Sequence, residues 1–244
     1  MLWLALLAVL VVAAATLAGG ALPLWFDRHS RVFLGFSAGT LVGLALLELI
    51  PEGSEAVPLD VHPEMLIVLG AFLTTMLLDK LHVLHPHSHG TDVTCLGHEP
   101  RPLAMHGAVG LLIHSAVDGL ALAAACRQSL GTAVAVTIAL SAHKLTDGIT
   151  TVSLVLSHRH ARRQAVRLLL GNAACLVLGF ALGMLVELGQ EGLGMLLLVM
   201  AGFFLYLGAS DLLPSVTAAR CRKRDVLATA LGMGAIALAS ALAH

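Results

Sequence analysis

The chain has 244 residues, of which 58% are hydrophobic and only 12% are charged, and its formal net charge is −1. No ordinary soluble domain needs so much apolar surface, so this composition excludes a water-soluble globular protein and indicates a membrane protein. The net charge says little about partners, but the sequence has no basic patch of the kind that binds nucleic acid. The four cysteines are scattered, which argues against a disulfide framework.

Eight segments carry enough consecutive apolar residues to cross the core of a bilayer, which takes about 20 residues per helix. The first segment has the position of a signal peptide, but it lacks a basic leading region and is as long as a full span, so we expect a retained helix. The sequence therefore predicts an all-α membrane protein with a single transmembrane domain over residues 1–244. The predicted spans cover residues 2–22, 32–51, 65–84, 103–126, 131–156, 164–188, 193–213 and 224–243.

Basic residues gather in the loops after spans 1, 3, 5 and 7 and at the adjoining helix ends. The loops on the opposite side of the predicted membrane, after the even-numbered spans, have only Arg127. Because Lys and Arg are enriched in cytoplasmic loops, we expect the odd-numbered loops in the cytoplasm and both termini outside it. The compact loops favour a bacterial inner membrane, although a eukaryotic organelle stays open. The loop at about residues 85–102 is also rich in histidine, with His85, His87, His89 and His98.

Spans 2 and 7 carry matching motifs at the same spacing. Ala38-Gly39 is followed by Glu48-Leu49-Ile50-Pro51, and Ala201-Gly202 is followed by Asp211-Leu212-Leu213-Pro214. The two spans run in opposite directions in the predicted topology, and spans 4 and 5 form a second such pair. Inverted repeats around a midplane site are typical of membrane transporters. The acidic residue of each motif could line one end of a transport path, or could equally cap and hydrate a helix end.

Spans 4 and 5 repeat one arrangement of ionisable residues. Each places a histidine four residues before an aspartate, and a glycine follows each aspartate. Residues four apart share one face of a helix, and ionisable groups in hydrocarbon are so costly that they usually mark an ion or substrate pathway. The glycines would let helices approach closely or let the backbone loosen. The two pairs are His114 with Asp118 and His143 with Asp147.

Two imidazoles and two carboxylates can replace the hydration shell of a divalent cation and neutralise its charge. This donor set favours Zn²⁺, with Fe²⁺, Mn²⁺ and Cd²⁺ as further candidates, over Ca²⁺ and Mg²⁺, which prefer oxygen alone. The simpler alternative is that these residues hydrogen-bond one helix to another, and Lys144 could form an internal salt bridge with Asp118 or Asp147. The duplication of the set favours a metal site halfway through the membrane.

The chain resembles the ZIP (Zrt/Irt-like protein) family of metal transporters over nearly its whole length. His114–Gly119 looks like the family's span 4 motif, His-Asn-x-x-Asp/Glu-Gly, and His143–Gly148 looks like its span 5 motif. Leu47–Glu52 and Phe204–Pro214 look like its spans 2 and 7, and the histidine-rich loop after span 3 also matches. The resemblance implies a ZIP-like bundle of eight helices with inverted repeats.

The resemblance also implies a binuclear metal site, whose inner position maps onto His114, Asp118 and Asp147, while His143 belongs to the span 5 motif. Asp118 would bridge to a second metal in those members that have one. The histidine-rich loop would receive or buffer metal on the cytoplasmic side, or it is a solvated linker that binds metal weakly. Neutral imidazoles, the form that binds zinc, predominate near neutral pH.

The chain departs from the family pattern at the second metal position. Ser115 stands where the family often has Asn, and Lys144 stands where it often has an acidic ligand. Span 6 has no acid in its middle and offers only Asn172 and Cys175 as donors. We therefore expect the second position to be absent or replaced by the Lys144 ammonium, so that one metal ion is carried at a time.

The leading hypothesis is a homodimeric carrier, not an enzyme, that moves a divalent transition metal into the cytoplasm by alternating access and holds no resident cofactor. The sequence has no GxxxxGK[ST] motif, so ATP is not expected to drive transport. The alternative from another class is an intramembrane zinc-dependent hydrolase, but the sequence has no HExxH motif. A third hypothesis is a metal sensor that binds through the histidine loop.

Overall fold

The structure, a computed structural model, describes residues 2–26, 30–83, 103–157, 162–186, 189–217 and 223–243, and all regular secondary structure in these ranges is helical. Within them the helices form eight membrane-length rods, which confirms the predicted all-α membrane fold. Six rods are single helices: α1 (Leu2–Trp25), α4 (Val61–Val83), α5 (Leu103–Gln128), α6 (Leu130–Ser157), α7 (Arg162–Leu185) and α10 (Lys223–Ala243). Two rods are composite: α2 (Ser30–Leu44), η2 (Ala45–Leu49) and α3 (Ile50–Ala56), and α8 (Gln190–Leu205), η3 (Tyr206–Leu212) and α9 (Leu213–Thr217).

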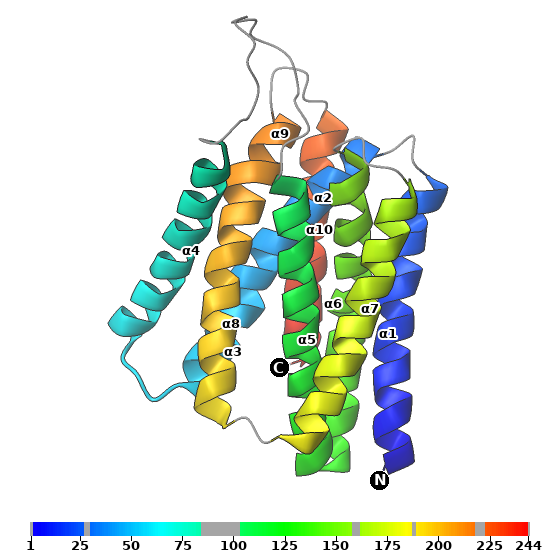
Figure 1. Ribbon diagram of the computed structural model, residues 1–244, viewed down its shortest axis with the longest axis vertical. Coiled ribbons are helices and arrows are strands. Elements are labelled where there is room, and N and C mark those ends of the chain that lie inside the picture. The colour runs from blue at the N-terminus through cyan, green and yellow to red at the C-terminus, as the bar shows by residue number, and fades with distance from the viewer. Residues whose placement is uncertain are drawn as a thin grey trace, which may run out of the picture.

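Successive rods alternate in direction. In Figure 1, α1 rises from the N-terminus at the bottom, the rod of α2 and α3 descends, and the alternation continues to α10. The composite rods that contain α2 and α8 therefore run in opposite directions, as do α5 and α6, which is the arrangement that the inverted repeats predict. Only Ser129 separates α5 from α6, and its hydroxyl accepts a hydrogen bond from the Thr132 amide in the first turn of α6.

Seven helical segments of the described chain are long and apolar enough to cross a membrane by length and composition alone. The eighth rod, α6, is the longest helix with 28 residues, but its middle carries His143, Lys144 and Asp147. α6 packs against α1, α2, α5, α7 and α10, so it presents much of its surface to protein. A helix enclosed in this way can be less apolar than its neighbours, because their side chains take the place of lipid.

The predicted end of span 2 at Pro51 is wrong, because the helix continues through this proline to Ala56. Proline has no N–H, so the Leu47 carbonyl lacks its usual helical partner. The π segment η2 precedes the proline, the Ile50 amide bonds to the Ala45 carbonyl five residues back, and Ser240 Oγ of α10 donates to Leu47 O at 3.3 Å. The freed Leu47 carbonyl thus finds a partner on a neighbouring helix. The second π segment, η3, ends at the matching place before Pro214.

The rods pack in two groups. α1, α5, α6 and α7 pack mainly on one another, and the rods of α2, α4, α8 and α10 form the second group. One apolar cluster, with Val12, Leu122 and Leu176 at its centre, is built entirely from helices of the first group. A larger cluster around Leu41 and Phe204 lies mainly in the second group. The groups meet where α6 packs against α2 and α10 and where α5 packs against α8.

The glycines that follow the two aspartates lie at close helix crossings. A Cβ atom on Gly119 would lie 2.2 Å from the Leu176 carbonyl oxygen of α7, and one on Gly148 would lie 2.0 Å from the Thr16 carbonyl oxygen of α1. Backbones approach this closely in membrane proteins only where a small residue leaves room. Of the two roles that the sequence leaves open for these glycines, the structure supports close helix approach.

We predict that Gly148→Ala destabilises the protein, because its methyl group would force α6 away from α1. Overpacking of this kind costs about 1–3 kcal/mol. Gly70→Ala on α4 is the matched control, since a Cβ there meets nothing within 4 Å. Alanine is the better helix former by about 0.5–1 kcal/mol, so the control should melt at or above the wild-type temperature. The measurement is thermal unfolding in detergent, and a Gly148→Ala protein as stable as the control would contradict the packing argument.

Candidate metal centre

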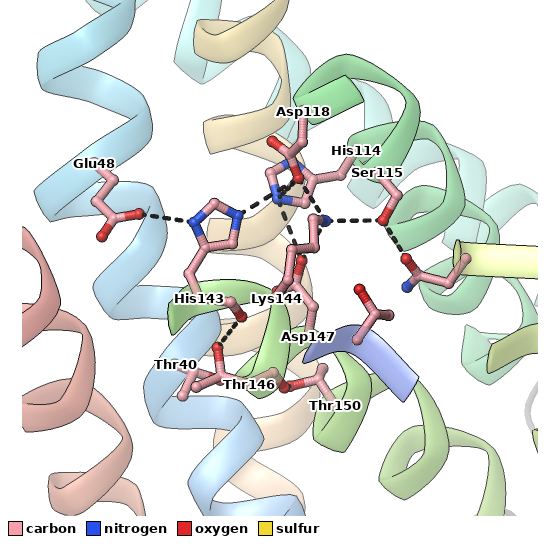
Figure 2. A network of polar contacts seen from close by, with 12 residues as sticks. Thr40, Glu48, His114, Ser115, Asp118, His143, Lys144, Thr146, Asp147 and Thr150 are labelled. Atoms are coloured by element: carbon pink, nitrogen blue, oxygen red, sulfur yellow. Dashed lines mark hydrogen bonds and ion pairs between the residues drawn. The ribbon is translucent and has the colours of Figure 1, made fainter. Parts of the chain in front are cut away.

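Two neighbouring helices bring the four predicted ligands together inside the bundle. His114 and Asp118 come from α5, and His143 and Asp147 come from α6. The side chains are buried, and one donor atom of each lies within 4.8 Å of those of the other three. Figure 2 shows all four pointing into one space between the helices. The i, i+4 spacing on each helix thus has the geometric consequence that the sequence predicts.

His114 faces both carboxylates. Its Nε2 atom lies 3.1 Å from Asp118 Oδ2 and 3.5 Å from Asp147 Oδ2, while its ring packs edge-on against Phe204 with centroids 4.9 Å apart. Both ring nitrogens are buried without a well-formed hydrogen bond. Buried nitrogens in this condition are uncommon, because leaving them unsatisfied costs about 1–3 kcal/mol. The ring is therefore held in place by packing, with an unused nitrogen directed at two acidic oxygens.

His143 links the cluster to the second group of helices. Its Nε2 lies 3.5 Å from Asp118 Oδ2, and its Nδ1 lies 3.5 Å from Glu48 Oε2, which comes from the π segment η2 (Figure 2). Thr146 Oγ1 donates to the His143 carbonyl at 2.6 Å and so occupies a backbone acceptor beside the ring. The ring plane lies close to parallel with that of His114, at a centroid distance of 5.8 Å. Glu48 therefore stands at the edge of the cluster.

Lys144 lies inside the cluster rather than beside it. Its ammonium nitrogen is 2.5 Å from Asp118 Oδ2, 2.7 Å from Asp147 Oδ2 and 2.8 Å from Ser115 Oγ. The lysine side chain is completely buried. Lys144 therefore forms salt bridges with both aspartates, whereas the sequence predicted a salt bridge with one or the other. Two carboxylates and one ammonium leave a net charge of −1 among these three groups.

A line of polar groups continues from the ammonium to α7. Ser115 Oγ donates to Asn172 Oδ1, and Asn172 Nδ2 donates to Thr151 Oγ1 at 2.9 Å. Thr151 in turn donates to the Asp147 carbonyl at 2.8 Å. This polar relay joins α5, α6 and α7 with buried hydrogen bonds, which fix side-chain positions when all members are satisfied. Thr151 was missed at the sequence level, although it lies four residues after Asp147 and so shares its helix face.

The other predicted residues have mixed outcomes. Asn172, Ser115 and Lys144 belong to the network around the cluster, whereas Cys175 on α7 is half-buried with a free thiol. Asp211 belongs to η3 by its backbone, but its side chain lies outside the described part. The predicted histidine-rich loop, with His85, His87, His89 and His98, also lies outside the described residues.

The fold and this cluster define a multi-pass membrane protein with ionisable side chains gathered in its core. The sequence profile of the ZIP zinc transporter family matches residues 82–240, and the chain belongs to this family. Rat zinc transporter ZIP4 is 25% identical over 250 residues, covering 76% of this chain. Mouse and human ZIP4 are 31% and 30% identical over shorter stretches, covering 44% and 46% of this chain. The matched stretch spans 16% to 38% of the length of these relatives.

We predict that Asn172→Ala lowers the free energy of unfolding by about 1–2 kcal/mol, because it leaves Ser115 and Thr151 without their shared partner. Interhelical hydrogen bonds in membranes contribute up to roughly this amount. Cys175→Ala, a substitution on the same helix outside the polar relay, is the control and should change stability less. Thermal unfolding of both variants in the same detergent is the measurement. Equal losses for the two variants would show that the relay contributes nothing beyond packing.

Proposed function

We propose that the protein is a membrane carrier for a divalent transition metal, with zinc as the foremost cargo and Fe²⁺, Mn²⁺ and Cd²⁺ as further candidates. The cargo ligands are His114, Asp118, His143 and Asp147. Membership of the ZIP family supports metal transport, and the printed names of the ZIP4 relatives, each a zinc transporter, support zinc. The same membership favours a carrier over an intramembrane hydrolase.

The observation that carries the ligand assignment is the unused Nε2 of His114, which faces the Oδ2 atoms of Asp118 and Asp147 at 3.1 and 3.5 Å. A cation between these three atoms would satisfy the nitrogen and both oxygens at once. Nitrogen and carboxylate oxygen are ligands that zinc prefers, at bond lengths of about 2.0–2.2 Å. Such bonds also require the Lys144 ammonium to leave the two oxygens, because it lies 2.5 and 2.7 Å from them.

His143 and Glu48 extend this site toward a more exposed edge of the cluster. Glu48 is only partly buried, with 14% of its side chain exposed, whereas Asp118 is 5% exposed. An acidic group at the rim attracts a cation, and the bridging imidazole offers the next donor inward. We infer an entry path that passes Glu48 and His143 before it reaches Asp118. Asp211, the matching acid of the other repeat, is the counterpart that we propose for the exit.

The division of the rods into two groups supports a mechanism of alternating access. The four ligands belong to the first group alone, and the second group contributes Glu48 at the boundary. A shift of one group against the other would expose the same ligands first to one side and then to the other. We further propose that the odd-numbered loops are cytoplasmic, that transport runs into the cytoplasm, and that two copies form a homodimer in a bacterial inner membrane.

We predict that His114→Ala and Asp118→Ala each lower the rate of radioactive zinc uptake by proteoliposomes about tenfold or more. Each substitution removes a ligand that the remaining groups cannot replace. His62→Ala is the matched control, since this histidine is exposed at the start of α4. All variants must be incorporated into the liposomes in equal amounts. Normal uptake by a well-incorporated His114→Ala, Asp118→Ala double variant would falsify the ligand assignment.

A further inference from the structure

Lys144 is the one member of the buried cluster that metal binding does not call for. A lysine ammonium has three hydrogen-bond donors and no acceptor, so it cannot ligate a metal and it repels one. Burying a charge in a membrane helix is also costly unless a partner or a function compensates. The lysine side chain is nevertheless fully buried, with 0% of its surface exposed. Its position therefore needs a physical explanation.

The ammonium uses the same oxygen atoms that face His114. It contacts Asp118 Oδ2 at 2.5 Å and Asp147 Oδ2 at 2.7 Å, and these two atoms are the ones nearest to His114 Nε2. A divalent ion bound there would compete with the ammonium for both carboxylates. Like charges at such separations repel by several kcal/mol in an interface that excludes water. The bound lysine and the bound metal therefore exclude one another from these two oxygens.

The polar relay offers the ammonium an alternative partner. Ser115 Oγ, at 2.8 Å from Lys144 Nζ, is its only described contact that is not a carboxylate, and Asn172 lies directly behind this hydroxyl. Figure 2 shows Ser115 on the side of the Lys144 ammonium that faces away from Glu48 and His143. An ammonium that keeps its hydrogen bond to Ser115 and turns away from Asp118 and Asp147 would leave the carboxylates free on the side from which we expect the metal to arrive.

We propose that the Lys144 ammonium acts as a covalently attached cation. It takes the place of a second, diffusible cation that would otherwise accompany the empty carrier on its return. It neutralises one carboxylate while the carrier is empty and withdraws toward Ser115 and Asn172 when the metal binds. This inference rests on the proposed carrier function. Asp118, Asp147 and Lys144 together carry −1 when empty and +1 with a divalent ion. Without the lysine, the two aspartates alone would carry −2 when empty and 0 with the ion.

The symmetry of these charges matters for the return of the empty carrier. The cost of moving a buried charge through a medium of low dielectric constant grows with the square of the charge. A core of −1 and a core of +1 therefore meet similar barriers, whereas an empty core of −2 would be held back. The lysine thus allows net transport without a second cation to accompany the empty carrier. The same repulsion weakens metal binding, which favours release.

The test compares the wild type with Lys144→Met, which keeps most of the volume and removes the charge. We expect the variant to bind zinc about tenfold more tightly by titration calorimetry, because a repelling charge is gone. Net uptake into zinc-free liposomes should fall about tenfold, while exchange of radioactive zinc into zinc-loaded liposomes stays near the wild-type rate. Lys144→Arg, which retains the charge, should restore net uptake. Unchanged binding, or an equal loss of net uptake and exchange, overturns the proposal.

A second pair of variants keeps the test decisive if Lys144→Met does not fold. Ser115→Ala removes the alternative partner, so the ammonium should stay on the carboxylates and zinc should bind more weakly than to the wild type. Ser153→Ala is the matched control, because this buried serine of α6 has no hydrogen-bond partner to lose. Equal zinc affinity in the two variants contradicts the role of the lysine. If the wild type itself neither binds nor carries zinc, the carrier function fails instead.

Discussion

The structure depends on two carboxylates and one ammonium that meet in the core of the helix bundle. Each of these charges would cost about 2.5–3.5 kcal/mol at the centre of an isolated membrane helix. Asp118, Asp147 and Lys144 offset this cost for one another through contacts of 2.5 and 2.7 Å. The compensation works only if α5 and α6 lie close together and other helices cover them, so the position of α6 inside the bundle follows from the charges that it carries.

Glycine makes that coverage possible. The residues after the two aspartates let α7 and α1 approach within the width of a side chain, at Gly119 and Gly148 respectively. The same residue type that weakens a helix in water is favoured here, because backbone contact replaces lipid with protein around the charges. Each aspartate and the glycine after it therefore act together. The aspartate supplies the charge, and the glycine leaves room for the neighbouring helix to pack closely.

Much of this arrangement could be predicted from the sequence. Apolar length gave the eight rods, and the i, i+4 spacing placed His114 with Asp118 and His143 with Asp147 on common faces. The continuation of the helix beyond Pro51 could not be predicted, because it depends on a π segment and on Ser240, which is distant in the sequence. Asp118 and Asp147 were both predicted as possible partners of Lys144, but that the ammonium contacts both at once, and Ser115 as well, could not be predicted, because Asp118 and Ser115 come from another helix.

The contacts of Lys144 are shorter than the polar contacts that cross the boundary between the two groups of rods. Lys144 is held at 2.5 to 2.8 Å by partners that all belong to the first group of rods. Across the boundary, His143 faces Glu48 at 3.5 Å, and Thr150 faces Thr40 at 3.4 Å. Hydrogen bonds weaken at such separations, so these cross-boundary contacts resist relative movement less than the contacts of Lys144 do. A displacement of the two groups would therefore preserve the geometry of the cluster and change mainly what lies beside His143, which is the property that a carrier with a single cation site requires.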